Sequence, residues 1–576
     1  MFNIPHSSSG GPASKKIPWS RESTFRDIGL ILLLSAFMYL PFLGLPVWDG
    51  HEPMRVIVSS SMLQSGNWII PMLHGKVYLI KPPLMNWLIA TSGAFFGTLN
   101  EWTSRIPSAL LMAATGVSVY GLTGRWLSTA GRLFAGIATI SMIGLIEKGR
   151  EADMDSLFIF FVALILLLWL NGYSRKWKPL QLWSMTLLLL SVGFLAKGPQ
   201  ILAFFYLTVF AYLLLRKDAA FFFSREHLIG LLLFIGVLSV YLFFVMQQVP
   251  FLEYLSMWID QITQRGESRY SHAFLKHIVT YPLEAIASFM PWSVFVAPIL
   301  FHRESRREVS KVVTNEIFLF ALVMVAVNFP LYWVLKSARV RYFLPAGPFV
   351  AIGIAALYDH YWSDAKHNPR IVGFFRGFLK VFCWLAVIIA IALVPLIPLL
   401  KLSFSPAIFF LMTALTATAV IILHRMKFLQ ITGLSVSTAI LTGFVFLTYT
   451  YLDIQSDSQK TYNPKKIASQ INAALSETAD TVYVMGYRRQ LDITCYLKKE
   501  VVQLDNLSEL VSLLDKAGAG DRIYFISDVT FLKKVHSDTE HIRGEEISWR
   551  KAASFPGKER DVEIILAYLE KKHGEL

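Results

Sequence analysis

One stretch decides the fold of this chain, residues 48–87, which reads WDGHEPMRVIVSSSMLQSGNWIIPMLHGKVYLIKPPLMNW. It lies between two apolar segments. Ionisable groups are costly beside hydrocarbon unless they have a function. The stretch is nevertheless rich in them: Asp49, His51, Glu52, Arg55, His74, Lys76 and Lys81. We therefore interpret it as part of an active site at a membrane surface.

The composition supports a membrane protein. Of 576 residues, 54% are hydrophobic and only 16% are charged, and the mean hydropathy is +0.49. Together with repeated long apolar runs, this predicts a polytopic membrane protein. The net charge of +14 comes from short basic clusters between apolar runs, so no nucleic-acid partner is expected. Cys383 and Cys495 show no CxxC spacing and predict no disulfide framework.

The topology depends on whether the apolar run 83–98 crosses the membrane. If it lies along the surface instead, the basic clusters between residues 125 and 427 all fall on the cytoplasmic side, as the positive-inside rule requires. Pro82-Pro83 suits the start of such a surface helix. This interpretation predicts about thirteen transmembrane helices, a cytoplasmic N-terminus, and surface helices over 54–64 and 251–264. The outer segments are then 48–105, 148–155, 196–199, 249–282, 336–341 and everything after 453.

The expected domains are a cytoplasmic tail (1–27), a transmembrane domain (28–452) with a catalytic outer loop (48–104), and a small periplasmic α/β domain (453–576). Within the last, helices are predicted over 465–476 and 507–517, and strands over 481–487, 493–497, 501–504 and 522–527. Residues 561–569 fit a strand or a helix equally. With no glycine-rich phosphate loop, this domain is expected to serve docking or substrate access.

Acidic residues recur on the outer side. Asp49 and Glu52 flank His51, and a carboxylate there could act as a general base. Glu52 could equally complement the dipole of a helix N-terminus. Asp155, in READMDS (150–156), could cap the next helix or share in the chemistry.

Cations also collect on this side. Lys81 and Lys197 stand at the outer ends of apolar runs, where lysines often only snorkel. Arginines at 265, 269, 339 and 341 add to them. Because the positive-inside rule disfavours such a field, it indicates an anionic partner such as a lipid phosphate. No pair among His74, His272 and His277 has i, i+4 ligand spacing, so a divalent metal is not favoured and no cofactor is expected.

A series of motifs points to a known family. In order they are HEPMR (51–55), YLIKPPLMNWLIA (78–90), SRIPSALL (104–111), READMDSLFIFF (150–161), FLAKGP (194–199), MPWS (290–293) and RVRYFLPAGP (339–348). The series resembles the GT-C fold glycosyltransferases of the protein O-mannosyltransferase and lipid A aminoarabinose transferase type, over residues 28–350. The resemblance implies transfer of a sugar from a polyprenyl-phosphate carrier, of the undecaprenyl-phosphate type, to a lipid, glycan or protein acceptor. It favours a lipid A-type acceptor on the periplasmic face of a bacterial inner membrane.

The resemblance also implies roles for residues. Glu52 matches the glutamate of the family's Asp-Glu-Pro-Arg motif, whereas His51 stands at the aspartate, which leaves Asp49 or Glu52 as the base. Asp155 matches a second acid, and Ile80 stands where relatives often have an acid, so a metal site there is not expected. The donor phosphate would be bound by Lys81, Lys197, Arg265 and Arg341. Further candidate site residues are His51, Arg55, Tyr78, Asp153 and Arg339.

The expected reaction is a direct displacement at the anomeric carbon with inversion. A transporter or flippase is the main alternative, and a non-catalytic receptor is a second. Transporters place ionisable residues near the midplane in repeated halves, whereas these charges gather at outer ends of the apolar runs and no internal repeat is present. Covalent transfer by the purified protein would separate the three classes.

Overall fold

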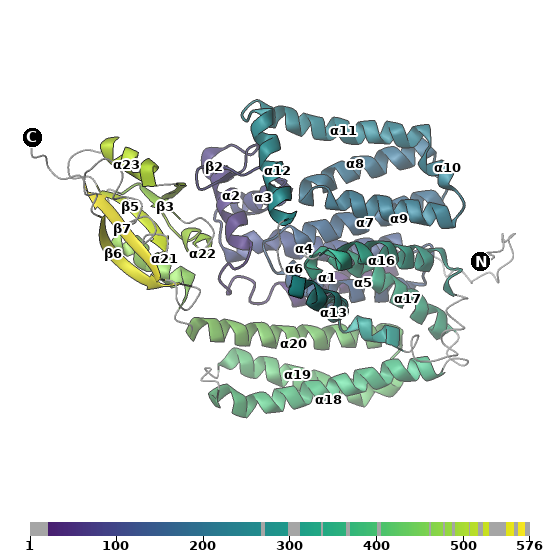
Figure 1. Ribbon diagram of the computed structural model, residues 1–576. Helices are drawn as coiled ribbons and strands as arrows, with labels where there is room; N and C mark the ends of the chain where they lie inside the picture. The colour runs from purple at the N-terminus through teal and green to yellow at the C-terminus, as the bar shows by residue number, and fades with distance from the viewer. Residues whose placement is uncertain are drawn as a thin grey trace, which may run out of the picture.

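The structure is a computed structural model, and it is almost entirely helical apart from a small C-terminal sheet (Figure 1). The residues that it describes are 21–266, 271–297, 312–335, 338–363, 369–399, 405–459, 462–475, 479–485, 490–505, 507–516, 522–528, 549–557 and 563–570.

The helical bundle comprises most of the chain. Its helices are α1 (Arg21–Tyr39), α4 (Glu101–Leu122), α5 (Thr129–Ile140), α6 (Ile143–Gly149), α7 (Asp155–Ser174), α8 (Pro179–Lys197), α9 (Gln200–Leu215), α10 (Ala219–Phe222), α11 (Arg225–Met246), α16 (Glu316–Val334), α17 (Gly347–Ser363), α18 (Pro369–Leu399), α19 (Pro406–Arg425) and α20 (Ile431–Gln459). Short 3-10 turns accompany them: η1 (Trp292–Val296), η2 (Val340–Tyr342), η3 (Leu344–Ala346) and η4 (Met426–Phe428).

Seven helices in the described part of the chain are long and apolar enough to cross a membrane, or up to eight if the bent pair α5 and α6 forms one span. The seven comprise α7, α8, α10 with α11, α16, α18, α19 and α20. The predicted multi-pass, mainly α-helical architecture is therefore confirmed. The expected number of thirteen spans stays a prediction, since helices such as α9, with 16 residues, are shorter than a full span.

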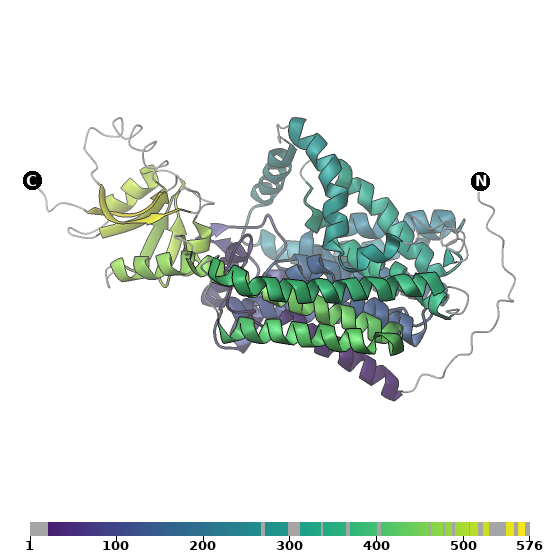
Figure 2. The same cartoon turned by 90° about the horizontal axis from the view of Figure 1, so that it is seen from below.

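The centre of the bundle is α7. In its most apolar stretch, 78% of the residues are buried. The helix packs on α4, α8 and α9. Trp169 of α7 and Trp183 of α8 are fully buried in this core. Helices α18, α19 and α20 lie side by side along one flank of the bundle (Figure 2). The buried centre thus holds the ends of α7 and α8 in fixed positions.

The first outer segment folds as two helices and a hairpin at one end of the bundle. They are α2 (Glu52–Ser65), β1 (Met72–Leu73), β2 (Lys76–Val77) and α3 (Leu84–Phe95). Pro53 opens α2, and Gly66 ends it in the left-handed conformation. At 12 residues, α3 is about 18 Å long, too short for a hydrocarbon core of about 30 Å. Helices α12 (Phe251–Gly266) and α13 (Ser271–Ser288) follow α11.

The C-terminal part forms a five-stranded sheet with strand order β4-β3-β5-β7-β6. Its strands are β3 (Thr481–Val484), β4 (Glu500–Gln503), β5 (Arg522–Asp528), β6 (Trp549–Pro556) and β7 (Glu563–Glu570), with helices α21 (Pro464–Ala474), α22 (Leu491–Thr494) and α23 (Leu507–Lys516). The strand predicted over 493–497 is wrong, because this segment begins in the short helix α22. Helix α20 runs on to Gln459, so the expected boundary at 453 falls inside a helix.

Candidate active site

Six ionisable side chains from four parts of the chain meet where α7 begins and α8 ends, in segments that the sequence predicts to be outer. They are His51 and Arg55 at the start of α2, Asp153 before α7, Asp155 at its first residue, Lys197 at the end of α8, and Arg341 in η2. We call them the outer cluster. All six were site candidates from the sequence, either for their charge or through the resemblance, and the fold brings them together.

Asp153 is the hub of this cluster. Its Oδ1 lies 3.6 Å from Nε of Arg55, and its Oδ2 lies 3.6 Å from Nη1 of Arg341. The Met154 amide donates to Oδ1 at 2.8 Å. Burial alone would raise the pKa of Asp153, but attraction by Arg55 and His51 and the amide hydrogen bond lower it below its usual value. Asp153 is therefore an ionised group that holds two arginines.

Asp155 forms an ion pair with Lys197, and both side chains are buried. The Lys197 ammonium also lies 4.8 Å from the ring centroid of Phe158 and 5.1 Å from that of Tyr342. Aromatic faces stabilise a cation at such distances. Lys197 is thus held inside the protein by Asp155 and two aromatic rings and is not a lysine that snorkels to water.

Arg341 donates from Nη2 to Nε2 of His51 over 2.8 Å. A guanidinium only donates, so Nε2 of His51 accepts, and the imidazole is neutral with its proton on Nδ1. Burial lowers the pKa of His51 below its usual value; Asp153 opposes this, while Arg341, Arg55 and Arg339 add to it. The histidine is therefore neutral at neutral pH.

Several polar atoms of the outer cluster are buried and have no hydrogen-bond partner among the described residues. They are Nε and Nη1 of Arg55, Nε of Arg341 and Oδ2 of Asp155. Such groups are costly unless something binds them. Three cations face two carboxylates, so the unsatisfied donors suit an anionic ligand.

Glu52 lies beside the cluster but is fully engaged. Its oxygens accept from Nε and Nη2 of Arg105 at 2.7 and 2.6 Å, and Oε1 also accepts from the Ala152 amide at 2.7 Å. Arg105 in turn donates to the carbonyls of Leu43 and Pro46. Glu52 therefore joins the first outer segment to α4 and to the connection before α7.

Asp49 is exposed and turns toward the C-terminal domain. The pKa of Tyr462 is raised chiefly by burial, then by the charge of Asp492, and to a smaller extent by the charge of Asp49. Its own amide donates to Oε2 of Glu52 at 3.3 Å. The backbone of Asp49 is therefore held by Glu52, and its carboxylate acts electrostatically on Tyr462 of the C-terminal domain.

The remaining candidates take varied positions. Tyr78 is buried in an apolar group with Val58 and Met62. Arg339 is exposed, and its positive charge helps to lower the pKa of His51. Lys81 is half-buried before α3. The side chain of Arg265, together with Arg269 and the side chain of His272, lies outside the described residues.

The C-terminal domain packs directly on the first outer segment. The rings of Trp48 and Tyr496 stack with centroids 4.7 Å apart. The Tyr496 hydroxyl accepts from the Trp48 amide at 2.9 Å and donates to Glu101 at 3.1 Å. Lys465 binds the same Glu101 oxygen at 2.8 Å. The segment that carries His51 and Glu52 is thus held from both sides.

The hairpin between α2 and α3 makes a second contact with the domain. Nε2 of His74 lies 2.9 Å from Oγ1 of Thr494, and the His74 carbonyl accepts from the Gln503 amide at 2.9 Å. His74 and Gly75 both have positive φ, 51° and 78°, as a two-residue hairpin turn requires. Sequence reasoning counted His74 among the ionisable groups of residues 48–87 and considered it as a metal ligand, a role that it did not favour.

Two functional contacts were missed from the sequence. Arg105 lies in the motif SRIPSALL but was not singled out, because one arginine in an apolar run carries no signal about its partner. Tyr496 was placed in a strand. Its distance from Trp48, 448 positions along the chain, left nothing local that could have revealed the pairing.

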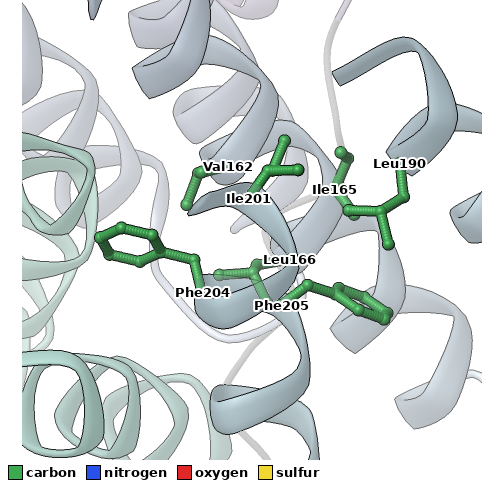
Figure 3. Close-up of a pocket in the computed structure, with 7 residues that line it drawn as sticks. All are labelled: Val162, Ile165, Leu166, Leu190, Ile201, Phe204 and Phe205. Atoms are coloured by element: carbon green, nitrogen blue, oxygen red, sulfur yellow. The ribbon is translucent and has the colours of Figure 1, made fainter. Parts of the chain in front are cut away.

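Two other features bear on ligand binding. Among the described residues, no group of three His, Cys, Asp or Glu side chains could hold a metal ion. A gap between α7, α8 and α9 is lined only by apolar side chains, which point into it from the three helices (Figure 3). It has no room for a water molecule. The gap is a feature of core packing and adds nothing to the outer cluster.

Comparisons with known proteins agree with this architecture. A family model described as dolichyl-phosphate-mannose-protein mannosyltransferase matches residues 80–244. ArnT from Cupriavidus metallidurans, in a crystal structure with bound undecaprenyl phosphate, superimposes with a TM-score of 0.67 at 15% identity, over 95% of this chain and 98% of that one. The fold is therefore the GT-C fold of membrane glycosyltransferases.

Within that class, the sequence is similar to particular relatives. It is 28% identical to a protein of Aquifex aeolicus over 65% of this chain and 73% of that one. It is 33% identical to undecaprenyl phosphate-alpha-4-amino-4-deoxy-L-arabinose arabinosyl transferase of Pseudomonas savastanoi over 31% of this chain. The match covers 34% of that relative, so the chain spans about a third of the arabinosyl transferases' length. The chain thus resembles the aminoarabinose transferases, which confirms the resemblance expected from its motifs.

Proposed function

We propose that this protein is a membrane glycosyltransferase that moves a sugar from a polyprenyl-phosphate carrier of the undecaprenyl type to an acceptor. The acceptor is a lipid, a glycan or a protein hydroxyl, and the resemblance to aminoarabinose transferases favours a lipid A-type acceptor. The sugar is a hexose or a pentose. We further propose that the outer cluster and the C-terminal domain face the periplasm of a bacterial inner membrane, with the N-terminus in the cytoplasm.

The observation that supports this function is the outer cluster itself. Arg55, Lys197 and Arg341 converge there, and Arg55 and Arg341 have buried donors without a hydrogen-bond partner. A lipid phosphate brings the negative charge and the acceptor oxygens that such donors lack. Lys81, Arg265 and Arg339 are proposed to add to the field around the same phosphate.

The proposed chemistry is a displacement at the anomeric carbon. The acceptor nucleophile attacks that carbon and loses its proton to a base, while the bond to the phosphate oxygen breaks with its electron pair. Cations fixed in place before the reaction stabilise the charge on the departing polyprenyl phosphate. A direct displacement inverts the configuration of the sugar.

The residues of the site have different roles in this proposal. Lys197 and Arg341 touch the phosphate, and Asp155 and Asp153 hold them. Glu52 is engaged by Arg105, so proton transfer to it would require that buried ion pair to break. We therefore assign Glu52 a positioning role. Asp49, exposed next to the C-terminal domain, is proposed to contact the acceptor side.

Purified full-length protein in nanodiscs, incubated with labelled undecaprenyl phosphate-α-4-amino-4-deoxy-L-arabinose and lipid A, tests the function. The expected product is labelled lipid A, identified by mass spectrometry. Envelope lipids and glycoproteins from cells with and without the protein extend the test to other sugars and acceptors. Movement of the carrier across the bilayer with no covalent product in either assay would contradict the proposal and favour a flippase.

A further inference from the structure

The position that corresponds to the family's aspartate is occupied here by His51, and three buried carboxylates near it, those of Glu52, Asp153 and Asp155, are poorly suited to take a proton. Glu52 accepts from Arg105 and from the Ala152 amide. Asp153 is buried and held ionised by two arginines, which makes it a weak base. Asp155 is buried against Lys197. His51, by contrast, is only partly buried.

We propose that His51 is the general base of the transfer reaction, and that Arg341 masks its Nε2 lone pair until the donor phosphate binds. The inference rests on the proposed function. It is carried by the Arg341–His51 hydrogen bond of 2.8 Å, which fixes Nε2 as the acceptor atom. A base must hold a free lone pair toward the nucleophile, and Nε2 is that atom once Arg341 moves.

The donor phosphate supplies a reason for Arg341 to move. Its Nε is buried without a partner, and its Nη1 lies 3.6 Å from Asp153, longer than a good hydrogen bond. A phosphate offers charged acceptors to the whole guanidinium fork. Binding of the phosphate therefore draws Arg341 away from His51 and exposes Nε2.

The proton balance is complete without another reactant. Nε2 of His51 takes the proton of the acceptor hydroxyl as its oxygen bonds to the anomeric carbon, and the electron pair of the broken bond goes to the phosphate. The resulting imidazolium carries protons on both nitrogens. The charged groups that face His51 are Asp153, Arg341, Arg55 and Arg339. Attraction by the Asp153 carboxylate stabilises the imidazolium.

The electrostatics agree with this assignment. The pKa of His51 is lowered, chiefly by burial, so the free protein holds a neutral histidine at neutral pH. Departure of Arg341 and arrival of a phosphate both favour the imidazolium and raise that pKa. A base poised near the working pH is the most effective one.

The first test uses undecaprenyl phosphate alone, so it does not depend on the sugar. Diethyl pyrocarbonate modifies neutral imidazoles, and mass spectrometry of the peptide with His51 reports its reactivity. We expect low reactivity in the free protein and a several-fold rise when undecaprenyl phosphate binds. The Arg341→Gln variant is expected to be reactive without the lipid. Unchanged reactivity in both conditions would overturn the masking, whereas no binding of the lipid at all would count against the proposed function as a whole.

The second test is the pH dependence of transfer. His51→Gln keeps an acceptor for Arg341 but cannot take a proton at neutral pH, so its rate is expected to fall by about 10²- to 10⁴-fold while it still binds undecaprenyl phosphate. His51→Asp is expected to retain activity and to shift the acid limb of the rate profile to lower pH by about one unit or more, since the usual pKa of aspartate is about 3.9. His424→Asn, at an exposed histidine on α19, is the matched control.

Two results would overturn the assignment of the base. One is transfer by His51→Gln within about threefold of the unmodified protein, because loss of the base has a far larger effect. The other is an acid limb in His51→Asp that coincides with that of the unmodified protein. Normal lipid binding and thermal stability of both variants exclude misfolding as the cause of a lost rate.

Discussion

Glu52 and Arg105 form a two-point ion pair, with Nε to Oε1 at 2.7 Å and Nη2 to Oε2 at 2.6 Å, between the first outer segment and α4. The side chains are 6% and 4% exposed. Removal of one partner of a buried pair leaves the other charge uncompensated, which is strongly destabilising. The pair is therefore a joint between the segment that carries His51 and the bundle.

The first prediction concerns this joint. Glu52→Gln is expected to lower the free energy of unfolding by about 3 kcal/mol and to reduce the transfer rate without moving the acid limb of the pH profile. Thermal unfolding in detergent and rate measurements check this. Glu147→Gln is the matched control, because that carboxylate is 53% exposed and surface pairs contribute little. A fully stable Glu52→Gln variant that has lost transfer would instead make Glu52 the base.

The second prediction concerns Lys197. Lys197→Met is expected to reduce transfer by about 100-fold, the magnitude that one preorganised charge contributes, and to weaken binding of undecaprenyl phosphate. Asp155→Asn is expected to retain lipid binding, because it leaves the ammonium in place. Lys427→Met, at an exposed lysine in η4, serves as the control. Equal lipid affinity in Lys197→Met and the unmodified protein would remove Lys197 from the phosphate site.

The third prediction concerns the stack of Trp48 on Tyr496. Tyr496→Phe keeps the ring but loses the hydroxyl that contacts the Trp48 amide and Glu101. We expect the free energy of unfolding to fall by about 1–3 kcal/mol. Tyr496→Ala removes the ring as well and is expected to separate the domain from the outer segment. Limited proteolysis between α20 and α21 measures that separation. Tyr449→Phe, at a tyrosine that is 65% exposed, should behave like the unmodified protein, and equal protection of Tyr496→Ala would contradict the prediction.

The fourth prediction concerns pH and His74. Burial lowers the pKa of His74 from 6.5 to about 4. Between pH 6.5 and 4 the unfolded state therefore binds the extra proton, and stability falls as the pH falls through this range, by about 3 kcal/mol in total. Thermal unfolding of the protein measured at pH 7.5, 6 and 5 should show this decline in stability. His74→Gln is expected to flatten it, and an equally steep decline in that variant would assign the effect to another group.

Much of the architecture could be predicted from sequence because the signals were local. Each signal lies within a short stretch of sequence: the apolar runs, the basic clusters and the double proline at 82–83. From them the multi-pass bundle and the short helix α3 could be predicted. The C-terminal strands β3, β4 and β5 also followed from alternating apolar residues. The error over 493–497 has a physical cause: Ile493 and Thr494 favour strands, but packing of α22 on the first outer segment overrides that preference.

The candidate site was predictable as a set of residues but not as a set of partners. Asp155 and Lys197 were each singled out for charge in a costly position. Their pairing depends on how α7 and α8 align, which no single segment encodes. The same holds for His51 and Arg341, which are 290 positions apart, and for Tyr78, whose buried place in an apolar group follows only from the fold of the hairpin.

The contact between Trp48 and Tyr496 also has a consequence for biosynthesis. The outer segment with His51 leaves the ribosome early, whereas Tyr496 follows 448 residues later. Until that residue has been made, the Trp48 amide lacks the hydroxyl that accepts from it. The contact that holds the first outer segment against the C-terminal domain therefore forms only after all of the bundle helices have been translated.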